Sequence, residues 1–174
     1  MLLKQLGELI SASALCLALG AANVQAAPIE LKTVGEGNYR YLFWQLYNAR
    51  LASTDGQFID YQTSAPLLLE LTYKRSISKQ QFIDATVDEW KKLKHSSDAQ
   101  QRQWATALEN IWRDVQDGDR LSALLGKQQT VQFFLNDQPI GEITDRAFSE
   151  AFFDIWLHPD TSAPTLRRQL LATQ

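Results

Sequence analysis

The segment 35–51, GEGNYRYLFWQLYNARL, constrains the fold more than any other part of the chain. It opens with a Gly-x-Gly turn signal, and both of its alternating sets of positions are then largely apolar. Successive side chains of a strand point to opposite faces, so such a run predicts a strand that is covered on both sides. We expect a long strand over 38–52, with a short strand over 31–34 before the glycines.

One of the two alternating sets has a guanidinium near each end, at Arg40 and Arg50. The apolar members between them are Leu42, Trp44 and Leu46. Two interpretations stay open. The set forms core with arginines that reach the solvent at its edges, or it forms the floor of a pocket for an amphipathic ligand whose carboxylate an arginine grips. Three phenols of the same segment offer further hydroxyl donors: Tyr39, Tyr41 and Tyr47.

Residues 1–26 have the features of a signal peptide. Lys4 gives a basic start, 9–22 is an apolar run, and small residues precede a cleavage site after Ala26. The run is shorter than the roughly 20 residues of a membrane span, although an uncleaved anchor is the alternative. We expect cleavage after Ala26, a periplasmic or secreted protein without a membrane span, and a single domain over 27–174.

Composition excludes several function classes. The net charge is −3 and the basic residues form no cluster, which argues against nucleic-acid binding. The only cysteine, Cys16, lies in the expected signal peptide, so the remaining chain has neither a disulfide nor a thiol nucleophile. The two histidines, His95 and His158, have no partner at metal-ligand spacing. We therefore expect no metal, no cofactor and no catalytic residue.

The rest of the chain alternates groups of strands with groups of helices. Strands are expected at 67–73, 120–125, 129–135 and 140–143. Capping signals start helices at Ser78 with Gln81 and at Asp98 with Gln101, Thr144 or Asp145 caps a third, and a short helix follows Ser162 and Pro164. This segregation predicts an α+β fold, with an antiparallel sheet and a layer of helices on one face.

The order of several short motifs resembles one known family. The motifs are Gly35-x-Gly37-x-x-Arg40, Leu69-x-Leu71-x-Tyr73-x-Arg75, Ser78-x-x-Gln81-Phe82, Gly118-Asp119-Arg120-Leu121, Gly141-x-Ile143 and Ala151-Phe152-Phe153-x-Ile155-Trp156-Leu157. Together they are similar to the bacterial chalcone isomerase-like proteins, which are exported single-domain chains. The resemblance implies an open-faced sandwich with a ligand cleft between sheet and helices. The wider superfamily includes plant enzymes that close a flavanone ring and non-catalytic members that bind fatty acids.

The polar groups of the enzymes match this chain poorly. Tyr39 stands where the resemblance places the arginine of the site, and Arg40 comes one position later, which on a strand means the opposite face. The strand threonine falls at Gln45, the tyrosine that starts the first helix falls at Phe82, and the asparagine after it falls at Glu89. Isomerase chemistry is therefore not expected from this set of side chains.

The leading hypothesis is a non-catalytic exported protein that binds a small apolar or amphipathic molecule such as a fatty acid. The predicted ligand-binding residues are Arg40, Tyr39, Tyr41, Trp44, Gln45, Tyr47 and Phe82. The alternatives are a structural or partner-binding module of the cell envelope, whose protein partner the sequence does not identify, and an intramolecular lyase of the chalcone type. The orientation of Leu42, Trp44 and Leu46, toward a cleft or toward packed helices, separates the first two.

Overall fold

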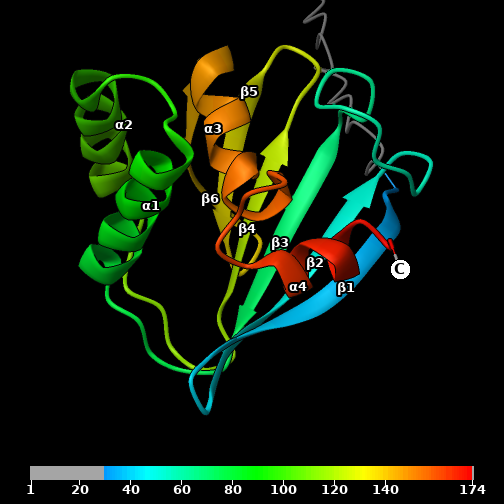
Figure 1. The fold of residues 1–174 in the computed structure, drawn as a ribbon, viewed down its shortest axis with the longest axis horizontal. Coiled ribbons are helices and arrows are strands. Elements are labelled where there is room, and N and C mark those ends of the chain that lie inside the picture. Colours follow the sequence, from blue (N-terminus) through cyan, green and yellow to red (C-terminus); the bar gives the residue numbers. More distant parts are fainter. Residues whose placement is uncertain (1–29, 174) are drawn as a thin grey trace, which may run out of the picture.

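The structure is a computed structural model that describes residues 30–173 (Figure 1). The predicted signal peptide and Cys16 lie outside the described residues. Six strands form one antiparallel sheet in the order β1-β2-β3-β4-β5-β6. The strands are β1 Lys32–Tyr41, β2 Trp44–Ser53, β3 Leu67–Tyr73, β4 Arg120–Leu125, β5 Thr130–Leu135 and β6 Gln138–Thr144. The helices are α1 Lys79–Leu93, α2 Asp98–Ile111, α3 Arg146–Leu157 and α4 Pro164–Leu170.

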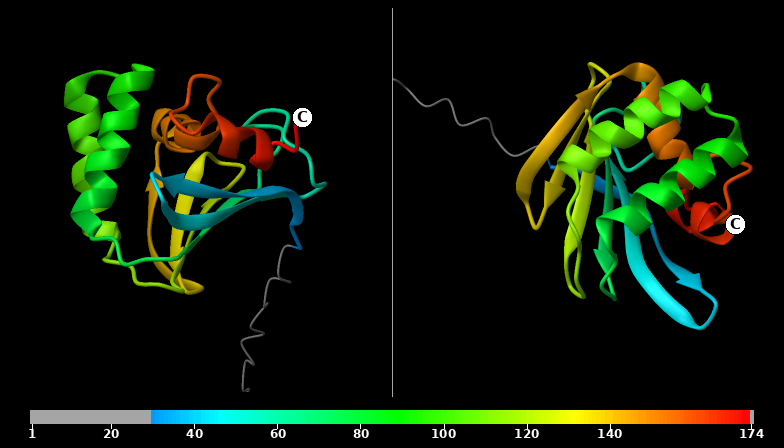
Figure 2. Two further views of the ribbon diagram at one scale, coloured as in Figure 1. Left: turned by 60° about the horizontal axis from the view of Figure 1, so that its bottom comes forward. Right: turned by 90° about the vertical axis from the view of Figure 1, so that its left-hand side faces the viewer.

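The four helices cover the same face of the sheet (Figure 2). The core lies between these two layers. A row across the sheet shows how it is built: Leu51, Leu69, Ala123 and Phe133 are in register on β2 to β5 and all are buried. The alternation in the sequence of β3, with buried Leu67, Leu69, Leu71 and Tyr73, follows from its one covered face. The predicted α+β open-faced sandwich is confirmed.

Local capping signals set the helix starts. Ser78 and Gln81 form the predicted capping box at α1. The prediction of an Asp98 cap for α2 is wrong by one residue: the Ser97 side chain accepts a hydrogen bond from the Gln100 N–H, and Asp98 is the first helical residue. Asp145 caps α3 and also accepts a 2.9 Å hydrogen bond from Trp104 Nε1, which ties α2 to the start of α3.

The predicted long strand over 38–52 is in fact a hairpin. The chain reverses at Leu42 and Phe43, and β1 returns as β2 with Tyr41 opposite Trp44. The expected separate strand over 31–34 merges into β1. The sequence does not mark this reversal, because the turn carries two large apolar residues in place of the Gly or Asn that marks most two-residue hairpin turns. Apolar character on both faces here reflects an exposed tip, not a doubly covered strand.

Gly35 and Gly37 do not form the predicted turn, because both lie within β1. Their role is close packing under α4. A Cβ atom on Gly35 would lie 2.5 Å from the Leu170 carbonyl oxygen, and one on Gly37 would lie 2.8 Å from Leu166 Cδ1. Any larger residue would push α4 away from the sheet, so the pair of glycines lets the C-terminal helix pack on an edge strand.

Candidate functional site

A cavity of about 510 Å³ opens between the inner face of the sheet and the helix layer. Its floor comes from β2, β3 and β4, and its walls come from α1, α3 and the segment that follows α3. The floor is apolar, with Leu46, Leu69, Leu71, Leu121 and Ala123. The volume lies within the range of about 300–1,000 Å³ that is typical of small-molecule sites. The cleft that the resemblance implied is therefore present in this chain.

A row of aromatic rings crosses the cavity from the edge strand to the helices. Tyr39 stacks on Tyr47 with ring centroids 5.3 Å apart, and Tyr47 meets Tyr73 edge-on at 5.7 Å. The row continues through Phe82, 5.1 Å from Tyr73, to Trp112, 5.8 Å from Phe82. Register explains the first three rings, because Tyr39, Tyr47 and Tyr73 are directly opposite one another on three neighbouring strands. The row is rigid and offers flat apolar surface together with hydroxyl groups.

The phenols of this row stay protonated at neutral pH. Burial raises the pKa of Tyr39, and the nearby charge of Glu89 adds to the effect. Burial also raises the pKa of Tyr47 and of Tyr73. Trp156 Nε1 donates a 3.0 Å hydrogen bond to the Tyr47 hydroxyl, which leaves the Tyr47 proton free to be donated. Among the described residues, the Tyr73 hydroxyl and Trp112 Nε1 have no hydrogen-bond partner. Within the described part of the chain, two donors of the row are therefore unpaired in the interior, and the Tyr47 hydroxyl keeps a proton to donate.

Glu89 is the one carboxylate among the described residues that line the cavity, and its position is fixed by structural contacts. Its Oε1 atom accepts a 2.8 Å hydrogen bond from the backbone N–H of Ser162 and lies 3.7 Å from Lys92 Nζ. Lys92 in turn donates to the carbonyl oxygen of Asp160 and to the Ser162 hydroxyl. These contacts hold the segment after α3 against α1 and close that side of the cavity.

Arg75 is the one guanidinium among the described residues of the cavity lining. It lies two residues beyond Tyr73, the last residue of β3, and its side chain is exposed at the mouth. Its Cζ atom lies 4.0 Å from the ring centroid of Trp44, a cation–π contact that orients the side chain. The signal for this residue in the sequence is weak, because Lys74 and Arg75 resemble any exposed basic pair at the end of a strand.

The structure brings four of the seven predicted ligand-binding residues together at the cavity: Tyr39, Tyr41, Tyr47 and Phe82. The other three do not line it. Trp44 is exposed on the hairpin, and Gln45 donates a hydrogen bond to Asn48. Arg40 lies beside a smaller depression next to α4. Tyr39 faces the cavity and Arg40 follows it on the strand, so the one-residue shift noted in the sequence does turn the guanidinium away.

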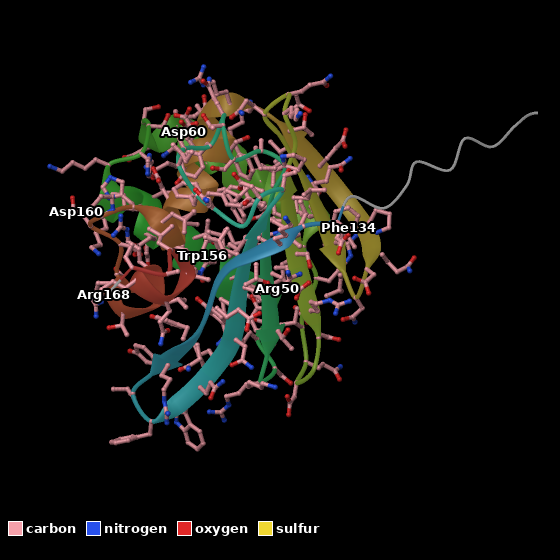
Figure 3. The ribbon with its side chains drawn as sticks, turned by 90° about the vertical axis from the view of Figure 1, so that its right-hand side faces the viewer. Arg50, Asp60, Phe134, Trp156, Asp160 and Arg168 are labelled. Carbon is pink, nitrogen blue, oxygen red and sulfur yellow. The ribbon has the colours of Figure 1, made fainter. Side chains whose placement is uncertain are left out.

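Arg50, the other arginine beside the apolar set, is not part of the cavity lining either. Arg50 Nε lies 3.4 Å from Glu70 Oε1, and Glu70 also faces Arg120 Nε at 3.6 Å. These three side chains belong to the sheet face away from the helices, where Figure 3 shows Arg50, whereas Trp156 lies on the helix side of β1 and β2. Of the three apolar residues between the arginines, Leu46 lines the cavity and Leu42 and Trp44 do not. The pairing of β1 with β2 shifts here: Tyr39 pairs with Tyr47 but Arg40 pairs with Gln45, so Leu46 lies at a bulge in β2.

The lining can bind and orient a molecule but holds few groups for chemistry. Among the described residues it contains neither imidazole, thiol nor amine. Phe82 and Glu89, the positions that the resemblance matched to a tyrosine and an asparagine, do lie in the cavity, without the hydroxyl and amide of those residues. Within residues 30–173, no three histidine or acidic side chains come together as metal ligands. Nor does this part of the chain contain a helix long and apolar enough to span a bilayer.

Comparison with known proteins agrees with this geometry. Residues 22–172 match the sequence profile of the family described as chalcone isomerase-like. An uncharacterised protein of Haemophilus influenzae is 26% identical over 147 residues, which cover 84% of this chain and 71% of that protein. The crystal structure of a fatty-acid binding protein of Arabidopsis thaliana superposes with a TM-score of 0.61 at 8% identity, covering 81% of this chain and 86% of that one. At so low an identity the superposition shows a shared fold alone. The profile match, which spans most of the chain, shows that the chain belongs to the chalcone isomerase-like family.

Proposed function

We propose that this chain binds a small amphipathic molecule, of the class of a long-chain carboxylate, in the cavity between sheet and helices. We further propose that the protein binds this ligand without converting it chemically. The observation that carries the proposal is the cavity itself, whose lining combines an apolar floor with Arg75 and with the phenols of Tyr39, Tyr41 and Tyr47. An apolar chain gains by leaving water on that floor. A carboxylate gains charge-assisted hydrogen bonds from a guanidinium and from neutral phenols.

Two further points support binding over catalysis. A solved structure that shares this fold is named as a fatty-acid binding protein, which supports a ligand of that class in this architecture. The positions matched to polar side chains of the isomerases hold Phe82 and Glu89, and Glu89 is already engaged by the Ser162 backbone and Lys92. An isomerase would need those groups to stabilise a substrate phenolate.

The alternative of a structural or partner-binding module of the cell envelope predicts a filled interior. The open cavity of about 510 Å³ argues against this alternative. We therefore rank ligand binding first.

Export is a separate proposal, which rests on the signal-peptide features of residues 1–26. N-terminal sequencing of the protein from its native host checks it.

The test combines extraction with a blocked cavity. The purified protein is extracted with organic solvent and analysed by mass spectrometry, and the emptied protein is titrated with long-chain carboxylates and with a chalcone. Ala85→Trp is the informative variant, because Ala85 is exposed on α1 and yet lines the cavity, so an indole there occupies the mouth with little strain on the core. We expect the affinity to fall about tenfold or more.

Gln80→Trp is the matched control, because Gln80 is exposed on the same helix and is not part of the lining. It should leave the affinity unchanged. An extract without any ligand, together with the absence of saturable binding in the titration, would sink the proposal. Cyclisation of the chalcone by the wild-type protein would instead replace it with the isomerase alternative.

A further inference from the structure

The tip of the β1–β2 hairpin exposes an unusual amount of apolar surface. Its four consecutive residues, named the hairpin tip below, are Tyr41, Leu42, Phe43 and Trp44, with exposed fractions of 61%, 76%, 88% and 57%. Among the described residues, one other large apolar side chain, Ile59, is comparably exposed. Single exposed apolar residues are ordinary, whereas a contiguous group of this kind marks an interaction site.

Turn geometry does not explain this sequence. Leu42 has a φ of 55°, in the left-handed region where a leucine is strained and where Gly or Asn is preferred. A branched apolar side chain at such a position lowers the stability of the hairpin and gains no burial there, since Leu42 is 76% exposed. The apolar character of the tip is therefore a property that stability alone would not favour.

The chain segments that form the tip and its basic neighbours carry charges of one sign. Segments 37–54 and 71–83 contain no acidic residue. Arg40 precedes the tip, Lys74 donates its backbone N–H to the carbonyl oxygen of Leu46, and Arg75 lies over the Trp44 ring. Tryptophan and tyrosine together with arginine or lysine is the combination found where proteins meet the headgroup region of a bilayer, because rings sit at the interface and cations pair with phosphate.

The shape of the hairpin fits the same partner. The hairpin runs beyond the rest of the sheet as a narrow projection (Figures 1 and 3). Four residues on a convex turn are far fewer than the roughly 20–30 residues per side of a stable protein interface. A bilayer surface can be bound by a smaller group of residues, because the apolar side chains need only enter about 5–10 Å into the boundary between headgroups and acyl chains.

We propose that the hairpin tip docks onto the surface of a bilayer that contains anionic phospholipid. Tyr41 and Arg75 belong both to this end of the molecule and to the cavity lining, so docking turns the cavity mouth toward the lipid. An amphipathic ligand would then have a short path between bilayer and cavity. Docking itself does not rest on the proposed function and is measured without any added ligand.

The experiment uses the chain from Ala27 onward, which carries all six strands and all four helices of the described structure. Vesicles of phosphatidylcholine with phosphatidylglycerol are compared with vesicles of phosphatidylcholine alone, by cosedimentation and by quenching with brominated lipid. Trp44 is the reporter: the other four tryptophans, at 90, 104, 112 and 156, are each at most 8% exposed. We expect binding to the anionic vesicles, weakening with salt, and quenching of Trp44.

Leu42→Asn with Phe43→Ser tests the tip, because it removes apolar surface, suits the turn and keeps Trp44. Binding should fall about tenfold or more. Arg40→Gln with Lys74→Gln should weaken binding to anionic vesicles alone. The controls are Ile59→Ser and Lys127→Gln, two exposed residues in the loops at the opposite end of the sheet, which should leave binding unchanged.

Three results would overturn the proposal. These are no binding to anionic vesicles, binding that leaves Trp44 unquenched, and binding that the tip variant retains. Self-association in sedimentation that the tip variant abolishes, without vesicle binding, would identify a second copy of the chain as the occupant instead. The tip variant should keep its affinity for soluble long-chain carboxylates within about twofold of wild type, because neither Leu42 nor Phe43 lines the cavity. Failure of docking is thus separable from failure of the proposed function.

Discussion

Arg75, not Arg40, is the guanidinium that the fold places at the cavity. Both arginines are exposed, both stand close to the hairpin and both carry the same charge, so composition cannot distinguish them. The difference lies in the cation–π contact of Arg75 with Trp44 and in its place in the lining. Under the proposed function, Arg75 is therefore the residue that we expect to contact the acid headgroup of the ligand.

Arg75→Gln should weaken binding of a long-chain carboxylate about five- to tenfold, or about 1–1.4 kcal/mol, since a charge-assisted bond at a solvent-exposed mouth is partly screened. Binding of the alcohol of equal chain length should not change. Arg40→Gln and Arg50→Gln are the matched controls and should leave both affinities unchanged in isothermal titration. A larger loss for Arg40→Gln than for Arg75→Gln would contradict this assignment.

Close packing of α4 on β1 depends on two residues without side chains. β1 is an edge strand of the sheet, and Gly35 and Gly37 let the helix backbone approach it. The helix buries Leu166 and Leu170 in return. Because α4 also follows the segment that Glu89 holds at the cavity wall, its position bears on the shape of the site.

Gly37→Val should lower the free energy of unfolding by about 1–3 kcal/mol, because a Cβ at this position overlaps Leu166 and Gln169. Urea unfolding followed by circular dichroism measures the change. Asn38→Ala, an exposed neighbour on the same strand, is the control and should remain within about 0.5 kcal/mol of wild type. Equal stabilities of Gly37→Val and the control would show that α4 does not need this close approach.

The molecule as a whole carries several phenols in its interior. Burial raises the pKa of Tyr47, Tyr61 and Tyr73, and the carboxylate of Asp154, which accepts a hydrogen bond from the Tyr61 hydroxyl, raises that of Tyr61 further. A folded-state pKa above the unfolded value of about 10 means that the folded state keeps its protons longer. Their contribution to stability is therefore complete below about pH 10 and is lost as the pH rises above that value.

Stability should be level from about pH 8 to about pH 10 as far as these groups are concerned, and above that should fall by up to about 1.4 kcal/mol per pH unit for each buried phenol. Urea unfolding as a function of pH, together with tyrosinate absorbance, measures it. Tyr73→Phe removes one such group. It should reduce the slope of the free energy of unfolding against pH by up to about 1.4 kcal/mol per pH unit, the contribution of one proton. A profile in which the buried tyrosines ionise without any loss of stability would refute the linkage.

Local sequence was enough for much of the architecture. The alternation of β3, the capping box of α1 and the stripe of α3 each depend on neighbouring residues, so strand 67–73, the helix pair, the hairpin of β4 and β5 and the last strand before α3 were all predicted, as was the open-faced sandwich. The phenols and Phe82 were also among the predicted site residues, the phenols as possible hydroxyl donors of the segment and Phe82 through the family resemblance.

Contacts between distant segments decided the rest. The reversal at Leu42 and Phe43 has no Gly or Asn to mark it, so the sequence of 35–51 predicts one strand. The antiparallel pairing of β2 with β1 shows that this segment is a hairpin. The use of Gly35 and Gly37 depends on α4, more than a hundred residues later, and the choice of Arg75 over Arg40 depends on strand register and a bulge. Periodicity and caps are properties of neighbours along the chain, and the sequence alone determined them. Which apolar residues line a cavity and which stand in solvent is a property of neighbours in space, and only the tertiary structure decided it.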